Sequence, residues 1–181
     1  GALLADHVGR ELRETLEILA RMFAGEPFDY SSARYELAGA IGRPVPVQPH
    51  IPVHIGGAGP KLTMPLVRDF ADWWNCPSYA ADRLAEVRPL AGDARVSVQH
   101  PVGLAAGDAD RDEVSALTQR RFGSWGGVVS GTSDEVAAAL VADVDLGARG
   151  FVVQFHDFGA TATLERFMAE VAPPVRAAAA G

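Results

Sequence analysis

The stretch Ile51-Pro-Val-His-Ile-Gly-Gly-Ala-Gly-Pro-Lys61 reads as a buried strand that ends in a glycine-rich turn. Val53 and Ile55 supply the β-branched bulk that is typical of strands. The glycines allow backbone conformations that other residues avoid, and they let the backbone approach a ligand closely. Residues 61–71 then have helical spacing, so amides in the turn and at the helix start would point at a bound anion. The pattern fits a phosphate cradle or a plain strand-to-helix connector equally well.

Length and composition favour one soluble domain. The 181 residues are 48% apolar, which is enough for a substantial core. The net charge of −7 argues against nucleic-acid binding, so an anionic ligand would need a local site. Cys76 is the only cysteine, which excludes an internal disulfide and a cysteine-based zinc site, and the five histidines lack metal-ligand spacing. No apolar run reaches the roughly 18 residues of a membrane helix and no signal peptide is apparent, so we expect a cytoplasmic chain without membrane contact.

Helical and extended segments alternate along the chain. Apolar residues at three- and four-residue steps predict a helix over residues 6–23, closed by Gly25. Residues 28–37 are expected to form a short hairpin or an extended excursion, and prolines between residues 44 and 52 keep the chain extended up to the first buried strand. Thr63 is a candidate cap for the helix that follows the glycine turn.

The remaining segments continue this alternation. Strands are expected at residues 72–76, 96–104 and 151–155, with helices at residues 61–71, 80–88 and 110–122. Residues 123–131 are expected to form a glycine-rich loop. Thr132-Ser-Asp-Glu135 matches a capping box at the start of a helix that ends at Gly147, and a final helix is expected to stop at Pro173.

Four strands separated by helices predict a parallel α/β sheet without a linker that divides the chain. We therefore expect residues 1–181 to form a single domain, with a helix over 1–25, an inserted segment over 26–50 and four β/α units over 51–181. A complete eight-stranded α/β barrel takes roughly 250 residues. The chain is accordingly either an open sheet or half of a barrel.

Several motifs, in their order and spacing, resemble the luciferase-like monooxygenase family of flavin- and deazaflavin-dependent (β/α)8 oxidoreductases. The segment Leu19-Ala-Arg-Met-Phe-Ala-Gly-Glu-Pro27 is similar to the helix before the family's mid-barrel insertion, and residues 51–60 resemble its fifth strand and phosphate loop. Phe70-Ala-Asp-Trp-Trp-Asn75 resembles the sixth strand, with Trp73 where glycine is usual. Ser130-Gly-Thr-Ser-Asp-Glu-Val136 resembles the start of a family helix, and residues 150–155 resemble the eighth strand.

The resemblance implies that the chain is the C-terminal half, about strands 5–8, of a luciferase-like TIM barrel. The implied activity is that of an oxidoreductase or monooxygenase acting on a small molecule. Because the absent strands supply much of the ring pocket and the acid or base, we expect little turnover by this chain alone. Its alanine- and arginine-rich, lysine-poor composition is typical of high-GC genomes, in which F420-dependent members of the resembled family are common, so the resemblance implies coenzyme F420 as cofactor, with FMN as the alternative. A homo-oligomer, or association with the missing barrel half, would cover the open sheet.

The implied cofactor site lies at the carboxyl ends of two neighbouring strands. The residues expected there are Gly56, Gly57, Ala58, Gly59, Lys61, Asn75 and Ser78. No catalytic residue is assigned and no metal site is expected. His156, directly after the last strand, is either a substrate or cofactor contact or an ordinary strand-end residue. The alternative function is a non-catalytic binding or assembly module on the same scaffold, in which the glycine turn is only structural.

Overall fold

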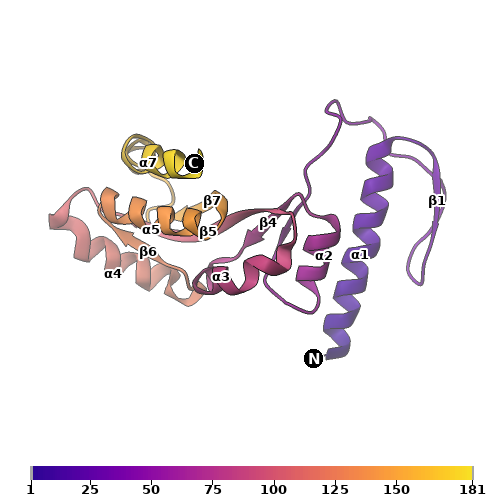
Figure 1. Cartoon of the computed structure of the whole chain (residues 1–181), viewed down its shortest axis with the longest axis horizontal. Coiled ribbons are helices and arrows are strands. Elements are labelled where there is room, and N and C mark those ends of the chain that lie inside the picture. The colour runs from indigo at the N-terminus through magenta and orange to yellow at the C-terminus, as the bar shows by residue number, and fades with distance from the viewer. Residues whose placement is uncertain (1, 181) are drawn as a thin grey trace.

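The computed structural model describes the backbone of residues 2–180 and the side chains of residues 9–180. Its centre is a five-stranded parallel sheet (Figure 1). The strands are β3 (His54–Gly56), β4 (Trp73–Cys76), β5 (Arg95–Leu104), β6 (Val129–Gly131) and β7 (Ala148–Phe155). Near-continuous apolar runs such as the one in β7 are typical of strands in parallel sheets.

Strand β5 is the longest and organises the sheet. Its first residues pair with β4 on one edge, and residues from Val96 to Val102 pair with β7 on the other edge. The short strand β6 joins β5 only at its end, where Val102 lies opposite Val129. Strands β3, β6 and β7 each pair with one strand only, β3 with β4 and the other two with β5.

Within residues 2–180, seven α-helices connect and flank these strands. They are α1 (Ala2–Ala24), α2 (Thr63–Phe70), α3 (Leu84–Val87), α4 (Arg111–Phe122), α5 (Ser133–Asp145), α6 (Thr161–Arg166) and α7 (Ala172–Ala180). Short 3₁₀ turns lie at Ser78–Arg83, Arg88–Ala91, Asp108–Asp110 and Gly123–Trp125, and a π-helical turn lies at Phe167–Val171. No helix among residues 2–180 combines the length and apolar character that crossing a bilayer requires.

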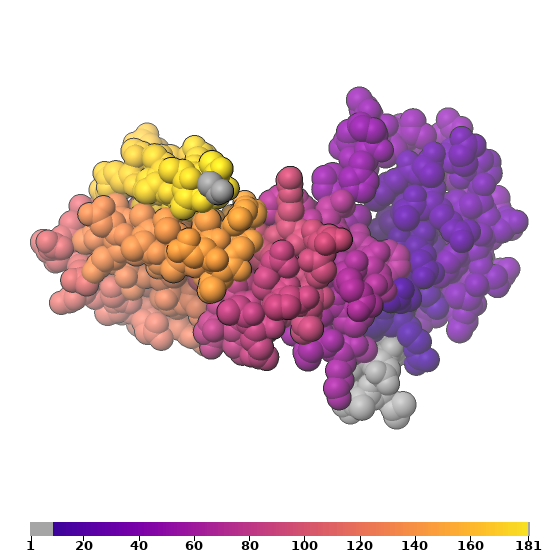
Figure 2. All heavy atoms as spheres, viewed as in Figure 1, coloured from indigo at the N-terminus to yellow at the C-terminus, as the bar shows by residue number. Residues whose placement is uncertain are grey.

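The apolar core has two parts, one at each end of β5. Trp74, Val96 and Val98 pack with α2 and α3 in the first part. Val102 and Phe155 pack with α5 and α7 in the second part. The molecule is accordingly elongated, with α1 at one end and the C-terminal helices at the other (Figures 1 and 2).

The inserted segment forms the predicted hairpin, made of β1 (Phe28–Ser31) and β2 (Glu36–Ala40), which pair antiparallel. The Tyr30 hydroxyl donates a hydrogen bond of 2.8 Å to the Glu17 carboxylate on α1. This contact attaches the hairpin to the first helix, away from the parallel sheet (Figure 1).

Four sequence predictions are wrong in detail. The expected loop over residues 123–131 ends in β6, because its last residues extend the sheet beside β5. The segment expected as one helix over 80–88 is mainly 3₁₀. Leu62, not Thr63, is the N-cap of α2. The chain stays helical after Pro173, since the π-helical turn at Phe167–Val171 leads without a break into α7, of which Pro173 is the second residue.

The capping box at the start of α5 is confirmed. Thr132 is the N-cap residue, and its backbone N–H donates to the Glu135 carboxylate at 3.0 Å. The chain leaves this helix at Gly147, whose φ of 101° is favourable only for glycine. The last β/α unit is therefore delimited by local sequence signals, as predicted.

Candidate functional site

The glycine turn follows the carboxyl end of β3. Gly56 is the last residue of that strand and lies opposite Asn75 on β4. Gly57 has a φ of 122°, and a Cβ on it would lie 3.0 Å from the Thr63 methyl group. A Cβ on Gly59 would meet the Thr63 hydroxyl at 3.2 Å. Glycine at position 57 is therefore required by both backbone conformation and space.

Two hydrogen bonds from β4 hold the turn in place. The indole Nε1–H of Trp74 donates to the Gly57 carbonyl oxygen at 2.7 Å. The Gly57 amide in turn points at the carbonyl oxygen of Asn75, 3.4 Å away. Because Trp74 is fully buried in the first part of the core, the turn is fixed to a rigid part of the sheet.

The amides at the start of α2 do not face a ligand, which corrects the sequence prediction. The N–H groups of Thr63 and Met64 both donate to the Gly59 carbonyl oxygen at 3.0 Å. Within the described part of the chain, the amides of Ala58, Gly59 and Lys61 have no acceptor. The free donors that an anion could use therefore belong to the turn itself and not to the first turn of the helix.

Asn75 adds a side-chain donor beside these amides. Its Oδ1 accepts a hydrogen bond of 2.9 Å from the Ser97 hydroxyl on β5, which fixes the orientation of the carboxamide. Its Nδ2 lies 3.9 Å from the position that a Cβ on Gly56 would occupy. A Cβ there would be in ordinary van der Waals contact with Asn75, so the exposed Gly56 lies directly beside the amide donor of this side chain.

The side chains of Ser78 and Lys61 lie away from this cluster of donors. Ser78 is buried, and its hydroxyl donates to the carbonyl oxygen of Trp125 at 3.1 Å. Lys61 is exposed and lines a groove together with Arg10 and Arg13 of α1, a groove that none of the turn's glycines lines. The structure therefore brings together Gly56, Gly57, Ala58, Gly59 and Asn75 with the backbone amide of Lys61, but not the side chains of Ser78 and Lys61.

Sequence analysis overlooked the contributions of Trp74, Thr63 and Ser97. Trp74 is a core residue, and its indole N–H also fixes the turn. Ser97 orients Asn75 from a strand more than twenty residues away. A polar residue at a buried strand position, such as Ser97, is the signal that could have indicated this contact.

Asp72, in the sixth-strand motif, is a structural residue. Its carboxylate accepts hydrogen bonds from the Val53 amide at 2.7 Å and from His50 Nε2 at 2.8 Å. These contacts, the Val53 bond first, lower the pKa of Asp72. Asp72 therefore joins the start of β4 to the segment before β3 and does not face the glycine turn.

His156, directly after β7, is a buried histidine. His156 is 7% exposed, and its Nδ1 has no hydrogen-bond partner, while its backbone N–H donates to the Val102 carbonyl oxygen at 2.8 Å. Its role as a ligand contact stays a prediction.

Among the described residues, no group of three or more His, Cys, Asp or Glu side chains could hold a metal ion.

Comparison with known proteins gives one family and one fold. The family model described as luciferase-like monooxygenase matches residues 4–122. A solved monooxygenase from Streptomyces bottropensis superimposes with a TM-score of 0.68 at 16% identity, over 89% of this chain and 60% of that protein. A coenzyme F420 dependent tetrahydromethanopterin reductase from Methanopyrus kandleri gives 0.68 at 14% identity, over 90% and 62%. A riboflavin lyase solved with modified FMN and riboflavin gives 0.71 at 12% identity, over 95% and 58%.

At these identities the superpositions show a shared α/β fold with a mostly parallel sheet. The chain spans about 60% of the length of the solved structures that it matches.

Proposed function

The chain belongs to the luciferase-like monooxygenase family, and from this premise we propose that it carries the phosphate-binding half of an F420- or FMN-dependent oxidoreductase. In this proposal it corresponds to the C-terminal half, about strands 5–8, of a (β/α)8 barrel. The cofactor supplies the redox chemistry when it is bound. The part of this chain is to bind the phosphate and to orient the remainder of the cofactor.

The observation that carries the proposal is the set of free donors in the glycine turn. Among the described residues the amides of Ala58, Gly59 and Lys61 have no acceptor, and the Asn75 carboxamide lies beside the exposed Gly56. A phosphate needs several N–H donors and a close backbone approach, and this arrangement offers both. Because the bonds from Trp74 and Ser97 fix the turn and Asn75 in advance, little ordering is required on binding.

Both cofactors remain candidates for this site. Solved proteins with this fold include the F420-dependent reductase and the riboflavin lyase that holds modified FMN. We rank F420 ahead of FMN on composition. Lys61 is the only lysine of an arginine- and alanine-rich chain, and such a composition is typical of the high-GC genomes in which F420 enzymes of this family are common. The glycine turn would serve either cofactor, because both present a phosphate.

The test replaces Gly56 by valine and titrates FMN and F420 separately, with cofactor fluorescence as the measurement. The Cβ of a valine at this position makes only ordinary van der Waals contact, since the nearest atoms, both of Asn75, are 3.9 Å away, and its methyl groups add bulk beside the turn. We expect the unchanged chain to bind one of the cofactors and Gly56→Val to lose at least about tenfold in affinity, the scale of one charge-assisted hydrogen bond.

Gly107→Val is the matched control, because a Cβ on Gly107 meets no atom within 4 Å. Equal affinity of Gly56→Val and the unchanged chain would show that the phosphate lies elsewhere. A folded chain that binds neither cofactor would favour the alternative, a non-catalytic binding or assembly module.

The half-barrel part of the proposal rests on the open sides of the sheet. β3 and β7 each pair along one edge only, and Val152 on β7 is 49% exposed. Unpaired edges and exposed apolar strand residues favour association. We therefore propose that a second copy, or a polypeptide carrying the other barrel half, covers the unpaired edges of β3 and β7. Sedimentation at micromolar concentration should show self-association, whereas a monodisperse monomer with a cooperative melt would contradict the half barrel.

A further inference from the structure

A groove of about 320 Å³ lies between α1 and the start of α2, apart from the glycine turn. Three cationic side chains line it, namely Arg10, Arg13 and Lys61. The rest of its described lining is glycine or apolar, and among residues 9–180 no acidic side chain lines it. The two helices come close here, since a Cβ on Gly9 would lie 3.2 Å from the Leu62 side chain.

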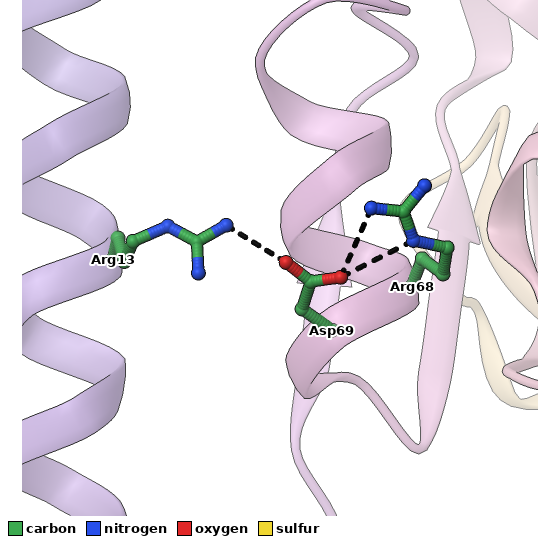
Figure 3. A network of polar contacts seen from close by, with 3 residues as sticks. All are labelled: Arg13, Arg68 and Asp69. Carbon is green, nitrogen blue, oxygen red and sulfur yellow. Dashed lines mark hydrogen bonds and ion pairs between the residues drawn. The ribbon is translucent and has the colours of Figure 1, made fainter.

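Arg13 is held in a fixed position at this groove (Figure 3). Its Nη2 donates to Asp69 at 2.8 Å, and its guanidinium lies 5.1 Å from the centre of the Phe70 ring. Asp69 also accepts bonds of 3.2 Å from Arg68, and these contacts, that with Arg13 first, lower the pKa of Asp69. Asp69 therefore stays ionised and holds Arg13, which uses one of the five N–H donors of its guanidinium for this contact.

Arg10 and Lys61 are exposed, and within the described side chains neither has an acidic partner. Asp69 offsets the charge of one arginine, so the groove stays positive in a chain with a net charge of −7. Cations that share a concave surface repel one another, and a bound anion relieves that repulsion. The donors of all three side chains are of the kind that recognises phosphate and carboxylate.

We propose that the groove of Arg10, Arg13 and Lys61 is a second anion site, which binds a phosphate or carboxylate group. This site does not depend on the cofactor assignment of the glycine turn. The anion is either a free ion or the end of a larger ligand that also contacts the turn. In both cases Arg13 provides the fixed donor, and the exposed side chains of Arg10, on α1, and Lys61, just before α2, also contact the anion.

The test titrates inorganic pyrophosphate by isothermal calorimetry at low salt into the 181-residue chain and into Arg10→Glu and Lys61→Glu. Both side chains are exposed, so reversal of their charge leaves the fold intact, which circular dichroism verifies. We expect each variant to lose at least about tenfold in affinity, the scale of one charge-assisted hydrogen bond. Arg120→Glu, at an exposed arginine of α4, is the matched control and should bind as the unchanged chain does.

Two outcomes would overturn the site: no measurable pyrophosphate binding by the unchanged chain, or equal losses for Arg120→Glu and the groove variants. Gly56→Val separates the two sources of the anion. Binding that persists in Gly56→Val and is lost in Lys61→Glu supports a site for a free anion. Binding lost in both supports a ligand that spans the groove and the turn. Failure of cofactor binding at the turn leaves the pyrophosphate result of the groove variants unaffected.

Discussion

The His100 imidazole and the Asp143 carboxylate lie 2.7 Å apart, between Nε2 and Oδ2, in the interior between β5 and α5. The other ring nitrogen, Nδ1, is 2.7 Å from the carbonyl oxygen of Gly127. A carbonyl oxygen only accepts hydrogen bonds, so Nδ1 carries a proton. A carboxylate also only accepts, so a further proton lies between Nε2 and Oδ2. The pair thereby ties a strand, a helix and the loop before β6 together.

Removing the Asp143 carboxylate should destabilise the fold strongly. Asp143→Ala leaves the buried His100 without its partner, and loss of one member of a buried pair costs about 3 kcal/mol. Urea unfolding measures the loss. Asp145→Ala, at an exposed position on the same helix, is the control and should change stability by less than about 0.5 kcal/mol. Equal midpoints for the two variants would mean that the His100 contact contributes little.

Trp74→Phe should loosen the glycine turn. The change removes the Nε1–H donor to the Gly57 carbonyl oxygen and also leaves a small cavity in the core. We expect a loss of about 2 kcal/mol in the free energy of unfolding. Trp73→Phe is the comparison, since Trp73 stacks on His54 and makes no hydrogen bond through its indole in the described structure. A loss as large for Trp73→Phe would show that ring size, and not the hydrogen bond, matters.

The thiol of Cys76 should be unreactive in the folded protein. It is fully buried at the end of β4, and burial, followed by the charges of Asp143 and Asp82, raises its pKa to about 12. At pH 8 the native thiol is therefore protonated as well as inaccessible. A chromogenic disulfide reagent should label Cys76 only as fast as the chain unfolds, and at once in denaturant. Rapid labelling of the native protein would contradict the buried position.

Asp157 should contribute stability that disappears in acid. Burial raises its pKa, but hydrogen bonds from the Thr163 hydroxyl at 2.6 Å and from the amides of Gly159 and Ala160 outweigh it and lower the pKa of Asp157. A folded-state pKa below the unfolded value of about 3.9 means that the stabilisation is complete above pH 4 to 5 and is lost as the pH falls through the folded value.

Asp157→Asn should therefore be less stable than the unchanged chain at pH 7, and the difference should shrink at pH 3. Urea unfolding at the two pH values measures it. Asp93→Asn, at an exposed aspartate without a partner in the described structure, is the control. A difference that is the same at both pH values would show that the charge of Asp157 is not the source of the stability.

Local sequence signals determined the elements of the fold. The glycines after Ile55 marked the end of β3, Thr132 and Glu135 marked the start of α5, and the apolar run before Phe155 marked a buried parallel strand. Such signals depend on backbone conformation and on neighbours within a few residues, which the sequence states directly. The family motifs depend on the same local signals, and for that reason the resemblance could be detected.

Tertiary structure alone decided which groups of the site are free to bind. Ser78 donates to Trp125, and Lys61 lines the same groove as two arginines of α1. Both arrangements bring together residues about fifty apart in the chain. No local pattern encodes such pairings, because they follow from how helices and strands pack against one another.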